Sequence, residues 1–325
     1  MSKKFLFFLI MILLVFAAVS SYANDQNGDS NDKGKPQAKE PVYPPYTGPK
    51  KRIAVTKFDN KVQGSYGNWN IGDGMSEMLT TELIKTGRFV VIERQALQDV
   101  VDEQKLGQSG LVQKETAAKI GQLLGAQIVI RGVVSEFEQT ESGGGKGISL
   151  FGVSLASKQS NAHVAVDIRM IDTVTGQVLY SHNAAGKAES SGVSVGVAVQ
   201  GMSFGADDFK KTPIGQATRQ AIHDAVKFIM DTMEKVPFSA KVIKFDGSKA
   251  YINAGASMNI KPGIKFNAYS VGEEIVDPDT GLKLGSEEKL VGVIEVREVQ
   301  DKFSTGVAAP GCGKLKKGDV LRLQE

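Results

Sequence analysis

The sequence predicts an α+β protein that ends in a small β-rich domain. Between residues 51 and 134, short apolar strand patterns alternate with segments of helical periodicity. From residue 135 to about 209 the chain is β-prone and rich in Gly and Ser, without a helical repeat. Beyond Pro237 no helical period returns, and short strand-like runs are separated by turn residues. We therefore expect an α/β body, extended β segments and a C-terminal β domain.

Residues 1–23 have the pattern of a secretory signal peptide. Lys3 and Lys4 precede the apolar run 5–19, which is too short to cross a bilayer core of roughly 30 Å as a helix. Ser21-Tyr22-Ala23 then supplies a small-x-small cleavage site. The sequence predicts export, and a retained membrane anchor is the alternative.

Composition and charge narrow the class of protein. Loss of two lysines on cleavage lowers the formal charge from +3 to +1, so there is no electrostatic reason to expect nucleic-acid binding. The sole cysteine, Cys312, cannot form an internal disulfide, and no cysteine lies near the cleavage site to carry a lipid. Residues 24–50 are polar and rich in proline, which predicts a flexible leader. We expect an exported protein that is not lipidated.

The body, residues 51–236, shows strands and helices in alternation. We expect strands at 52–58, 89–92 and 128–134, a polar Gly-rich loop at 59–73, and helices at 74–86, 95–103 and 116–124. A strand at 162–170 leads into a hairpin turn at 172–176 and a returning strand. A long helix at 212–235 begins with Thr212 as N-cap and Pro213 in the first helical position.

The C-terminal region, residues 237–325, predicts a small antiparallel barrel. Its expected strands are 240–245, 250–253, 263–269, 289–299 and 320–323.

Two segments in the middle region, 136–161 and 183–209, combine Gly, Ser and apolar residues. In the second segment four valines share one face of the expected strand and small or polar residues share the other. These valines are Val193, Val195, Val197 and Val199. Such a strand suits a membrane barrel, with the apolar face toward lipid. A half-buried strand in a soluble sheet has the same period, so the pattern leaves both interpretations open.

Residues 92–106, IERQALQDVVDEQKL, resemble the E-R-Q-x-L-Q stretch of the curli assembly channel (CsgG) family. Further matching segments follow in the same order: AQIVIRGVV at 126–134, SGG at 142–144, FG at 151–152, AVDIRM at 165–170 and TVTGQVL at 173–179. The resemblance covers about residues 51 to 235, well over half of the expected mature chain. The C-terminal domain lies beyond it and vaguely resembles the terminal module of the flagellar assembly protein FlgT.

The resemblance implies that segments 136–161 and 183–209 become membrane hairpins, and that a ring of copies closes one large barrel. Ring closure is also a physical need, because open strand edges cannot rest in lipid. The family narrows its channel with a loop bearing a tyrosine, an asparagine and an aromatic residue. Tyr66, Asn68 and Trp69 are the matching residues here. The loop is shorter than the family pattern between tyrosine and asparagine, and Trp69 as a core anchor is the alternative.

The implied function is a homo-oligomeric outer-membrane channel, facing the periplasm, that exports unfolded subunits of a surface fibre. Periplasmic accessory proteins are expected partners. Family members are typically lipoproteins, whereas this chain has no cysteine to acylate at the expected site, and it carries an extra domain. A soluble periplasmic scaffold or assembly factor with the same fold is therefore the alternative function. A third hypothesis is an envelope regulator that binds a partner enzyme.

The sequence offers no catalytic constellation, and we expect neither an enzyme, a metal site nor a cofactor. Three histidines lie far apart, and none has metal-ligand spacing: His163, His182 and His223. The run 143–146, GGGK, lacks the Ser or Thr and the helix of a phosphate loop. Glu93 and Arg94 fit an ion pair or helix cap better than an acid–base pair, and 277–281 is first a turn.

Overall fold

The computed structural model describes residues 41–62, 70–109, 112, 125–150, 153–193, 207–279, 281 and 283–324. The expected signal peptide and the expected helix 116–124 lie outside these residues. Of the predicted leader 24–50, the structure describes 41–50, which contains no helix or strand. Tyr43 in this segment donates a hydrogen bond of 3.3 Å from its hydroxyl to Glu82 Oε2. Burial, reinforced by the Glu82 carboxylate, raises the pKa of Tyr43 well above its ordinary value.

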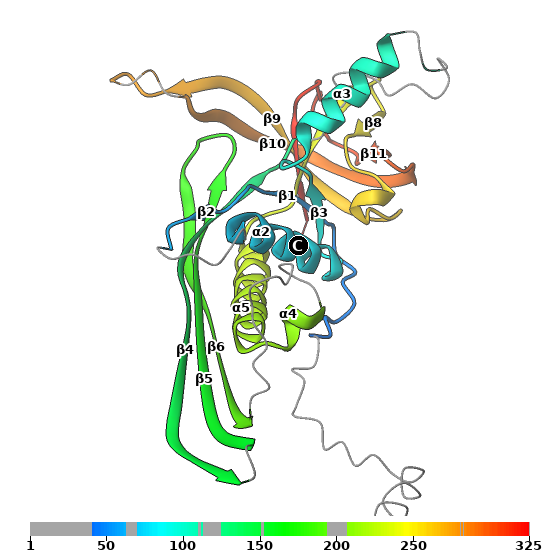
Figure 1. The fold of residues 1–325 in the computed structure, drawn as a ribbon. Coiled ribbons are helices and arrows are strands. Elements are labelled where there is room, and N and C mark those ends of the chain that lie inside the picture. Colours follow the sequence, from blue (N-terminus) through cyan, green and yellow to red (C-terminus); the bar gives the residue numbers. More distant parts are fainter. Residues whose placement is uncertain are drawn as a thin grey trace, which may run out of the picture. The chain divides into compact units, whose positions relative to one another are not determined.

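The body is built on one mixed sheet with the strand order β3-β1-β4-β5-β6 (Figure 1). β1 pairs in parallel with both β3 and β4, whereas β4–β5 and β5–β6 are antiparallel. A short strand, β2, pairs in parallel with β4. The strands are β1 (Lys51–Val55), β2 (Asp59–Asn60), β3 (Phe89–Ile92), β4 (Ile128–Leu150), β5 (Val153–Asp172) and β6 (Val178–Val193).

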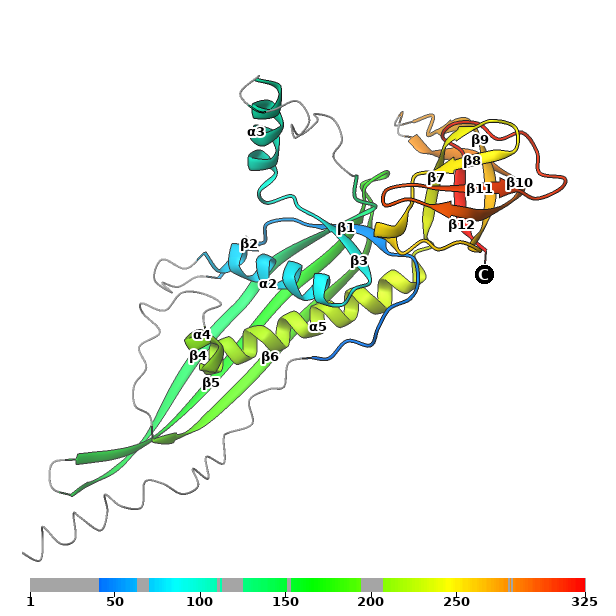
Figure 2. The same cartoon turned by 90° about the vertical axis from the view of Figure 1, so that its right-hand side faces the viewer.

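Two helices cover one face of this sheet, α2 (Ile71–Lys85) and α5 (Pro213–Lys235) (Figure 2). The Thr212 side chain caps α5 by accepting a 3.1 Å hydrogen bond from the Gly215 amide, as the sequence predicts. The expected apolar stripe of α5 is buried in the core of the body: Ile222, Val226, Ile229 and Met233. The short helix α4 (Asp207–Lys211) precedes α5 and buries Phe209.

Helix α3 (Leu97–Gln108) differs from the other body helices, because it lies apart from the sheet (Figures 1 and 2). It runs five residues further than the expected helix 95–103. Gln104 is its buried residue, while Val100 and Leu106 are exposed. Leu97 and Val101 on the same helix are part-buried.

The C-terminal region forms a closed antiparallel barrel with the strand order β10-β11-β8-β7-β12-β9. The predicted small barrel is therefore confirmed, and it contains one strand that the sequence analysis missed, β11. Its strands are β7 (Ser239–Phe245), β8 (Lys249–Ile252), β9 (Lys265–Val276), β10 (Lys283–Val299), β11 (Ser304–Ala308) and β12 (Val320–Leu323). A 3-10 turn, Ala256–Met258, follows β8.

Asp319, directly before β12, has a buried carboxylate that links this end of β12 to β9. Its two oxygens accept hydrogen bonds from the Val271 amide at 3.0 Å and from the Lys316 amide at 2.8 Å. Phe266 and Leu321 lie in the barrel's own core, which is separate from the core of the body. The α+β class and the β-rich C-terminal region thus agree with the sequence prediction.

Candidate functional site

The long β4–β5 hairpin contains the first predicted membrane segment, 136–161. Its ladder runs from the Ile128–Asp172 pair at the base to the Leu150–Val153 pair at the far end. The ladder shifts between Val134 and Glu136 and again between Gly144 and Ile148. Figure 2 shows that these strands continue beyond the helices that cover the sheet. The helices therefore cover the base of the hairpin, and among the described residues no helix covers its outer part.

The base of the hairpin is part of the soluble core. Phe137, Val164 and Val166 are buried in the same cluster as the face of α5. α5 approaches β6 closely at Gly186, where an added Cβ would lie 2.0 Å from the carbonyl oxygen of Ala217. A side chain at that position would force the helix off the strand.

The outer part is described by its backbone pairing. Here β4 pairs with β5 from Ser142–Gln159 onward, and β5 pairs with β6 up to Ser157–Val193. Of the predicted lipid-facing valines, Val193 is the last residue of β6. Val195, Val197 and Val199 lie outside the described residues, together with the rest of 194–206 in the second segment, 183–209.

Strand β6 lies at one edge of the described sheet, and side chains of α5 occupy part of that edge. Asp224 Oδ2 accepts a hydrogen bond of 3.3 Å from the Ala185 amide. Gln220 Oε1 accepts one of 2.8 Å from the Lys187 amide. Backbone amides that point to the same side recur every second residue in a strand, so these two side chains satisfy consecutive edge donors.

The same carboxylate of Asp224 also contacts His182, with 3.0 Å between Oδ2 and Nε2. The His182 ring stacks on Phe228 of α5 at a centroid distance of 4.7 Å. A second histidine, His163 on β5, lies 2.9 Å from Glu136 on β4. Each of these two histidines thus contacts a carboxylate on a neighbouring element.

The predicted constriction residues Tyr66, Asn68 and Trp69 lie outside the described residues, but both ends of their loop are described. At the first end, the buried ring of Phe58 lies against Gly132, where an added Cβ would be 2.6 Å from ring atoms. The carbonyl oxygen of Phe58 would be 2.2 Å from a Cβ on Gly72 in the first turn of α2. The loop therefore starts and ends at points fixed on the sheet and on α2.

Polar contacts also fix the two ends of the loop that contains Tyr66, Asn68 and Trp69. Asn70 is the N-cap of α2, and its side chain accepts from the Asp73 amide. Lys57 Nζ lies 2.6 Å from Asp73 Oδ2. Arg131 on β4 donates to Asp59 Oδ2 at 2.7 Å, and this hydrogen bond holds the pKa of Asp59 below its ordinary value.

Within the described ranges, no group of three or more His, Cys, Asp or Glu side chains is arranged to hold a metal ion. Of the helices that the structure describes, none is both long and apolar enough to span a membrane.

Comparison with known proteins assigns the chain to a family. The family model for the curli production assembly/transport component CsgG matches residues 41–247. This chain belongs to the CsgG family. The family is described as a component of curli production assembly and transport, which agrees with the coarse prediction of a transport protein. The match ends near the start of the barrel, so the resemblance of the barrel to FlgT stays a prediction.

Individual relatives are distant. CsgG of Salmonella typhimurium and CsgG of Escherichia coli K12 are each 29% identical over 124 residues, or 37% of this chain and 45% of theirs. The chain thus matches less than half the length of these curated CsgG proteins. A candidate lipoprotein of Neisseria meningitidis serogroup B is 27% identical over 195 residues, covering 58% of this chain and 79% of that protein. Among solved structures, the hypothetical protein CT253 of Chlamydia trachomatis aligns with 17% identity and a TM-score of 0.37, covering 55% of this chain and 95% of that one.

Proposed function

We propose that this CsgG-family chain forms a ring of identical copies in the outer membrane and exports unfolded subunits of a surface fibre or related structure. The observation that carries the proposal is the β4–β5 hairpin, whose strands run on beyond the helical layer (Figure 2). From Ser142 to Leu150, β4 has about the length of 9 to 11 residues that a barrel strand needs to cross a membrane, and it pairs with β5 on both sides of the register shift between Gly144 and Ile148.

The edge of β6 supports a specific way to close the ring. Own-chain side chains occupy the edge amides of Ala185 and Lys187. Pairing with a neighbouring strand therefore starts beyond Lys187, within the proposed membrane segment 183–209. There Val193, Val195, Val197 and Val199 face lipid in our proposal, and the wall closes when each copy supplies both hairpins. A closed wall leaves no strand edge in contact with lipid.

In the same proposal, Tyr66, Asn68 and Trp69 form the narrow collar of the channel. The fixed ends of their loop, at Phe58 and at Asn70, support this role, because a collar must hold its side chains at constant radius. Aromatic and amide side chains arranged in a ring pass an unfolded chain and exclude a folded one.

The test is to extract the outer membrane with detergent and to examine the purified protein by native electrophoresis and negative-stain imaging. We expect a large, heat-labile ring. Val195→Arg should reduce the membrane-inserted fraction, because an arginine facing lipid near the midplane costs about 2–4 kcal/mol per copy. Ser194→Arg, on the opposite face of the same strand, is the matched control and should insert nearly normally. A soluble monomer after osmotic shock would contradict the channel.

The second candidate is a soluble periplasmic assembly factor. One observation favours it: Phe137 and Val164 at the base of the hairpin are buried in the core of the same chain. In that case the barrel and the exposed side of α3 are the surfaces that contact periplasmic accessory proteins. The two candidates differ in the extraction test, since only the channel requires a detergent-stable ring.

A further inference from the structure

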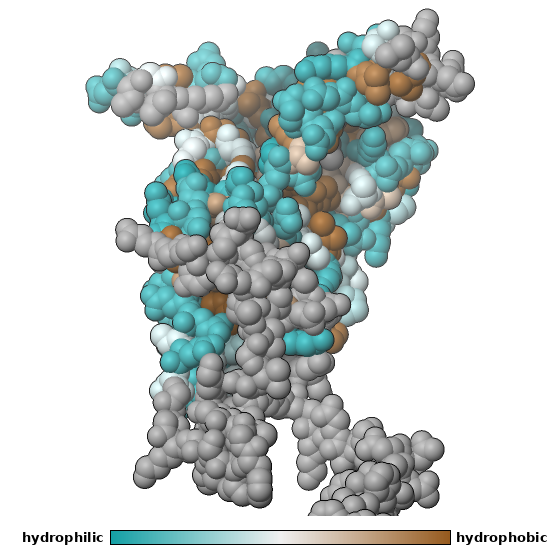
Figure 3. All heavy atoms as spheres, viewed as in Figure 1, coloured by the Kyte–Doolittle hydropathy of each residue, from teal (hydrophilic) through white to brown (hydrophobic). Residues whose placement is uncertain are grey.

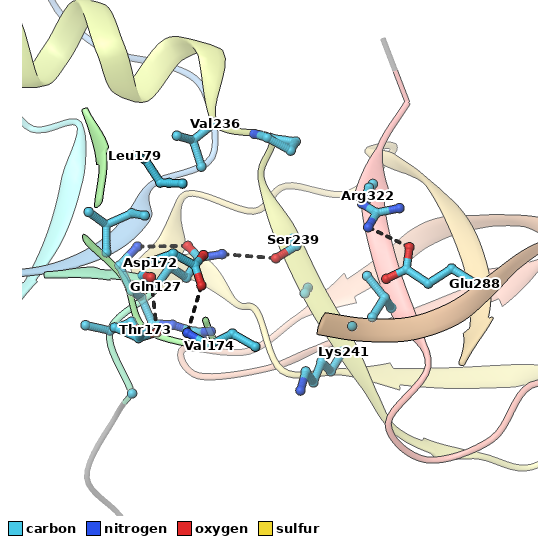
Figure 4. A pocket seen from close by; sticks show the side chains of 18 of the residues that line it. Gln127, Asp172, Thr173, Val174, Leu179, Val236, Ser239, Lys241, Glu288 and Arg322 are labelled. Carbon is cyan, nitrogen blue, oxygen red and sulfur yellow. Dashed lines mark hydrogen bonds and ion pairs between the residues drawn. The ribbon is translucent and has the colours of Figure 1, made fainter. Parts of the chain in front are cut away.

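A cavity of about 730 Å³ lies where the body meets the C-terminal barrel (Figure 4). Its walls come from the start of β4, the turn after β5, the end of α5, and the barrel strands β7, β9, β10 and β12. This volume is within the range of about 300 to 1,000 Å³ that is typical of small-molecule sites.

One side chain that lines the cavity, Gln127, forms hydrogen bonds to both the body and the barrel. Gln127 accepts a hydrogen bond of 3.3 Å from the Arg52 amide and donates one of 3.0 Å from Nε2 to Ser239 Oγ on β7. Figure 4 shows Gln127 and Asp172 on one side of the cavity and Glu288 and Arg322 on the other.

The two acidic side chains of the cavity are already satisfied. Glu288 Oε2 lies 2.6 Å from Arg322 Nη2. Asp172 Oδ1 accepts hydrogen bonds of 2.8 Å from the amides of Val174 and Thr175, and one of 3.1 Å from the Thr175 hydroxyl. Neither carboxylate is therefore available to balance the remaining positive charges.

Three basic side chains of the lining, unlike Arg322, have no ion pair with a carboxylate of the cavity in the part of the chain that the structure describes: Arg52, Lys235 and Lys241. Arg52 lines the cavity, and its buried Nε has no hydrogen-bond partner among the described residues. Burial lowers the pKa of this guanidinium. Lys241 lines the barrel side. Lys235 also lines the cavity, but it lies in the last turn of α5, where its charge offsets the partial negative charge of that helix end.

Apolar side chains form another part of the lining. Leu179 and Val236 lie near the end of α5 in Figure 4, and Val174 and Val320 also line the cavity. The cavity thus combines apolar surface with a guanidinium whose buried Nε has no partner among the described residues, which suits a molecule that has an anionic end and an apolar end.

We propose that this cavity binds a small amphipathic oxyanion, a carboxylate or a phosphate ester, with its charged head on Arg52 and its apolar part against the walls that include Leu179 and Val236. A guanidinium holds either head with two parallel hydrogen bonds. This binding site goes beyond fibre-subunit export and does not depend on whether the hairpins enter a membrane.

The test is calorimetric titration of the purified full chain with hexanoate and with hexyl phosphate, using 1-hexanol as the uncharged probe. We expect one or both anions to bind and hexanol to bind at least about 10-fold more weakly, as for loss of a charged hydrogen bond. Arg52→Gln should weaken anion binding by about 10-fold or more. Arg169→Gln removes an exposed arginine of β5 outside the cavity, and it should bind like the wild type.

Each result decides the proposal. Preference for hexanoate or for hexyl phosphate assigns the head group, and equal binding assigns oxyanions in general. Arg52→Lys keeps the charge without the planar fork, so it should bind more tightly than Arg52→Gln if that variant folds, and it replaces that variant if it does not. The proposal is overturned if neither anion binds the wild type, if hexanol binds as tightly as the anions, or if both arginine positions have equal effects.

Discussion

The close approach of α5 to β6 gives the sharpest stability prediction. Gly186→Ala places a methyl group 2.0 Å from the Ala217 carbonyl oxygen and 2.6 Å from the Ala221 nitrogen. Both atoms are backbone atoms of α5, so no side chain can rotate away to make room. Because real contacts of a Cβ are essentially never closer than 3.0 Å, the helix must move by at least about 1 Å.

The energetic cost follows from that movement. Overpacking a well-packed site costs about 1–3 kcal/mol. The shift also strains the hydrogen bonds that Asp224 and Gln220 accept from the β6 edge, each worth about 0.5–1.5 kcal/mol. These terms are coupled, so we expect a loss of at least about 2 kcal/mol in the free energy of unfolding of the body.

Urea unfolding followed by circular dichroism measures the loss, and hydrogen exchange followed by mass spectrometry locates it. Exchange should accelerate in β6 peptides that contain the amides of Ala185 and Lys187. Gly125→Ala is the matched control, because nothing lies within 4 Å of its added Cβ. Equal stability of the two variants, with unchanged β6 exchange, would refute the packing argument.

Three further predictions concern the barrel, the loop and the channel. Asp319→Asn should destabilise the protein by about 1–3 kcal/mol in thermal unfolding, because the amide side chain of asparagine has one oxygen to accept from the two backbone donors. The control Asp301→Asn changes an exposed carboxylate and should alter the melting temperature little. Equal melting temperatures of the two variants would contradict the prediction. Arg131→Gln should raise the pKa of Asp59 toward its ordinary value in an NMR titration. Since the native pKa lies below the unfolded one, ionised Asp59 stabilises the fold above the unfolded pKa, and that contribution is lost as pH falls through the native pKa; an unchanged titration would remove Arg131 as the cause. Trp69→Ala should increase single-channel conductance, and an unchanged conductance would exclude Trp69 from the collar.

Local signals predicted much of the fold. α5 was predictable because an N-cap threonine, an N1 proline and a continuous apolar stripe all agree over 23 residues. β3 occupies the predicted residues for a similar reason, since Phe89–Ile92 is a short apolar run between breakers. α2 begins at Ile71 rather than at 74, because Asn70 caps it ahead of two glycines that weaken the helical pattern.

Other features depend on contacts that no local pattern records. β4 continues to Leu150 through a run of Ser and Gly whose strand character comes from pairing with β5. β11 is five residues long and includes Gly306, so its signal is weak until β8 and β10 flank it. Arg52 and the cavity around it were missed because their partners are more than 70 residues away in the sequence.

The candidate site was predicted from the family resemblance more than from periodicity. The pattern of alternating valines fits a soluble sheet as well as a membrane wall. The anchored loop ends at Phe58 and the occupied β6 edge at Lys187 became visible only in three dimensions.

The most direct test of the account is the environment of the second segment in the membrane-extracted ring. Single cysteines, placed in a Cys312→Ser background and spin-labelled, report access to oxygen in lipid and to a polar reagent in water. We predict a strict alternation, with labels at Val195 and Val197 exposed to lipid and labels at Ser194 and Ala198 exposed to water. Labels that show no alternation, or that are all shielded inside one copy's own fold, would contradict the membrane wall and with it the channel.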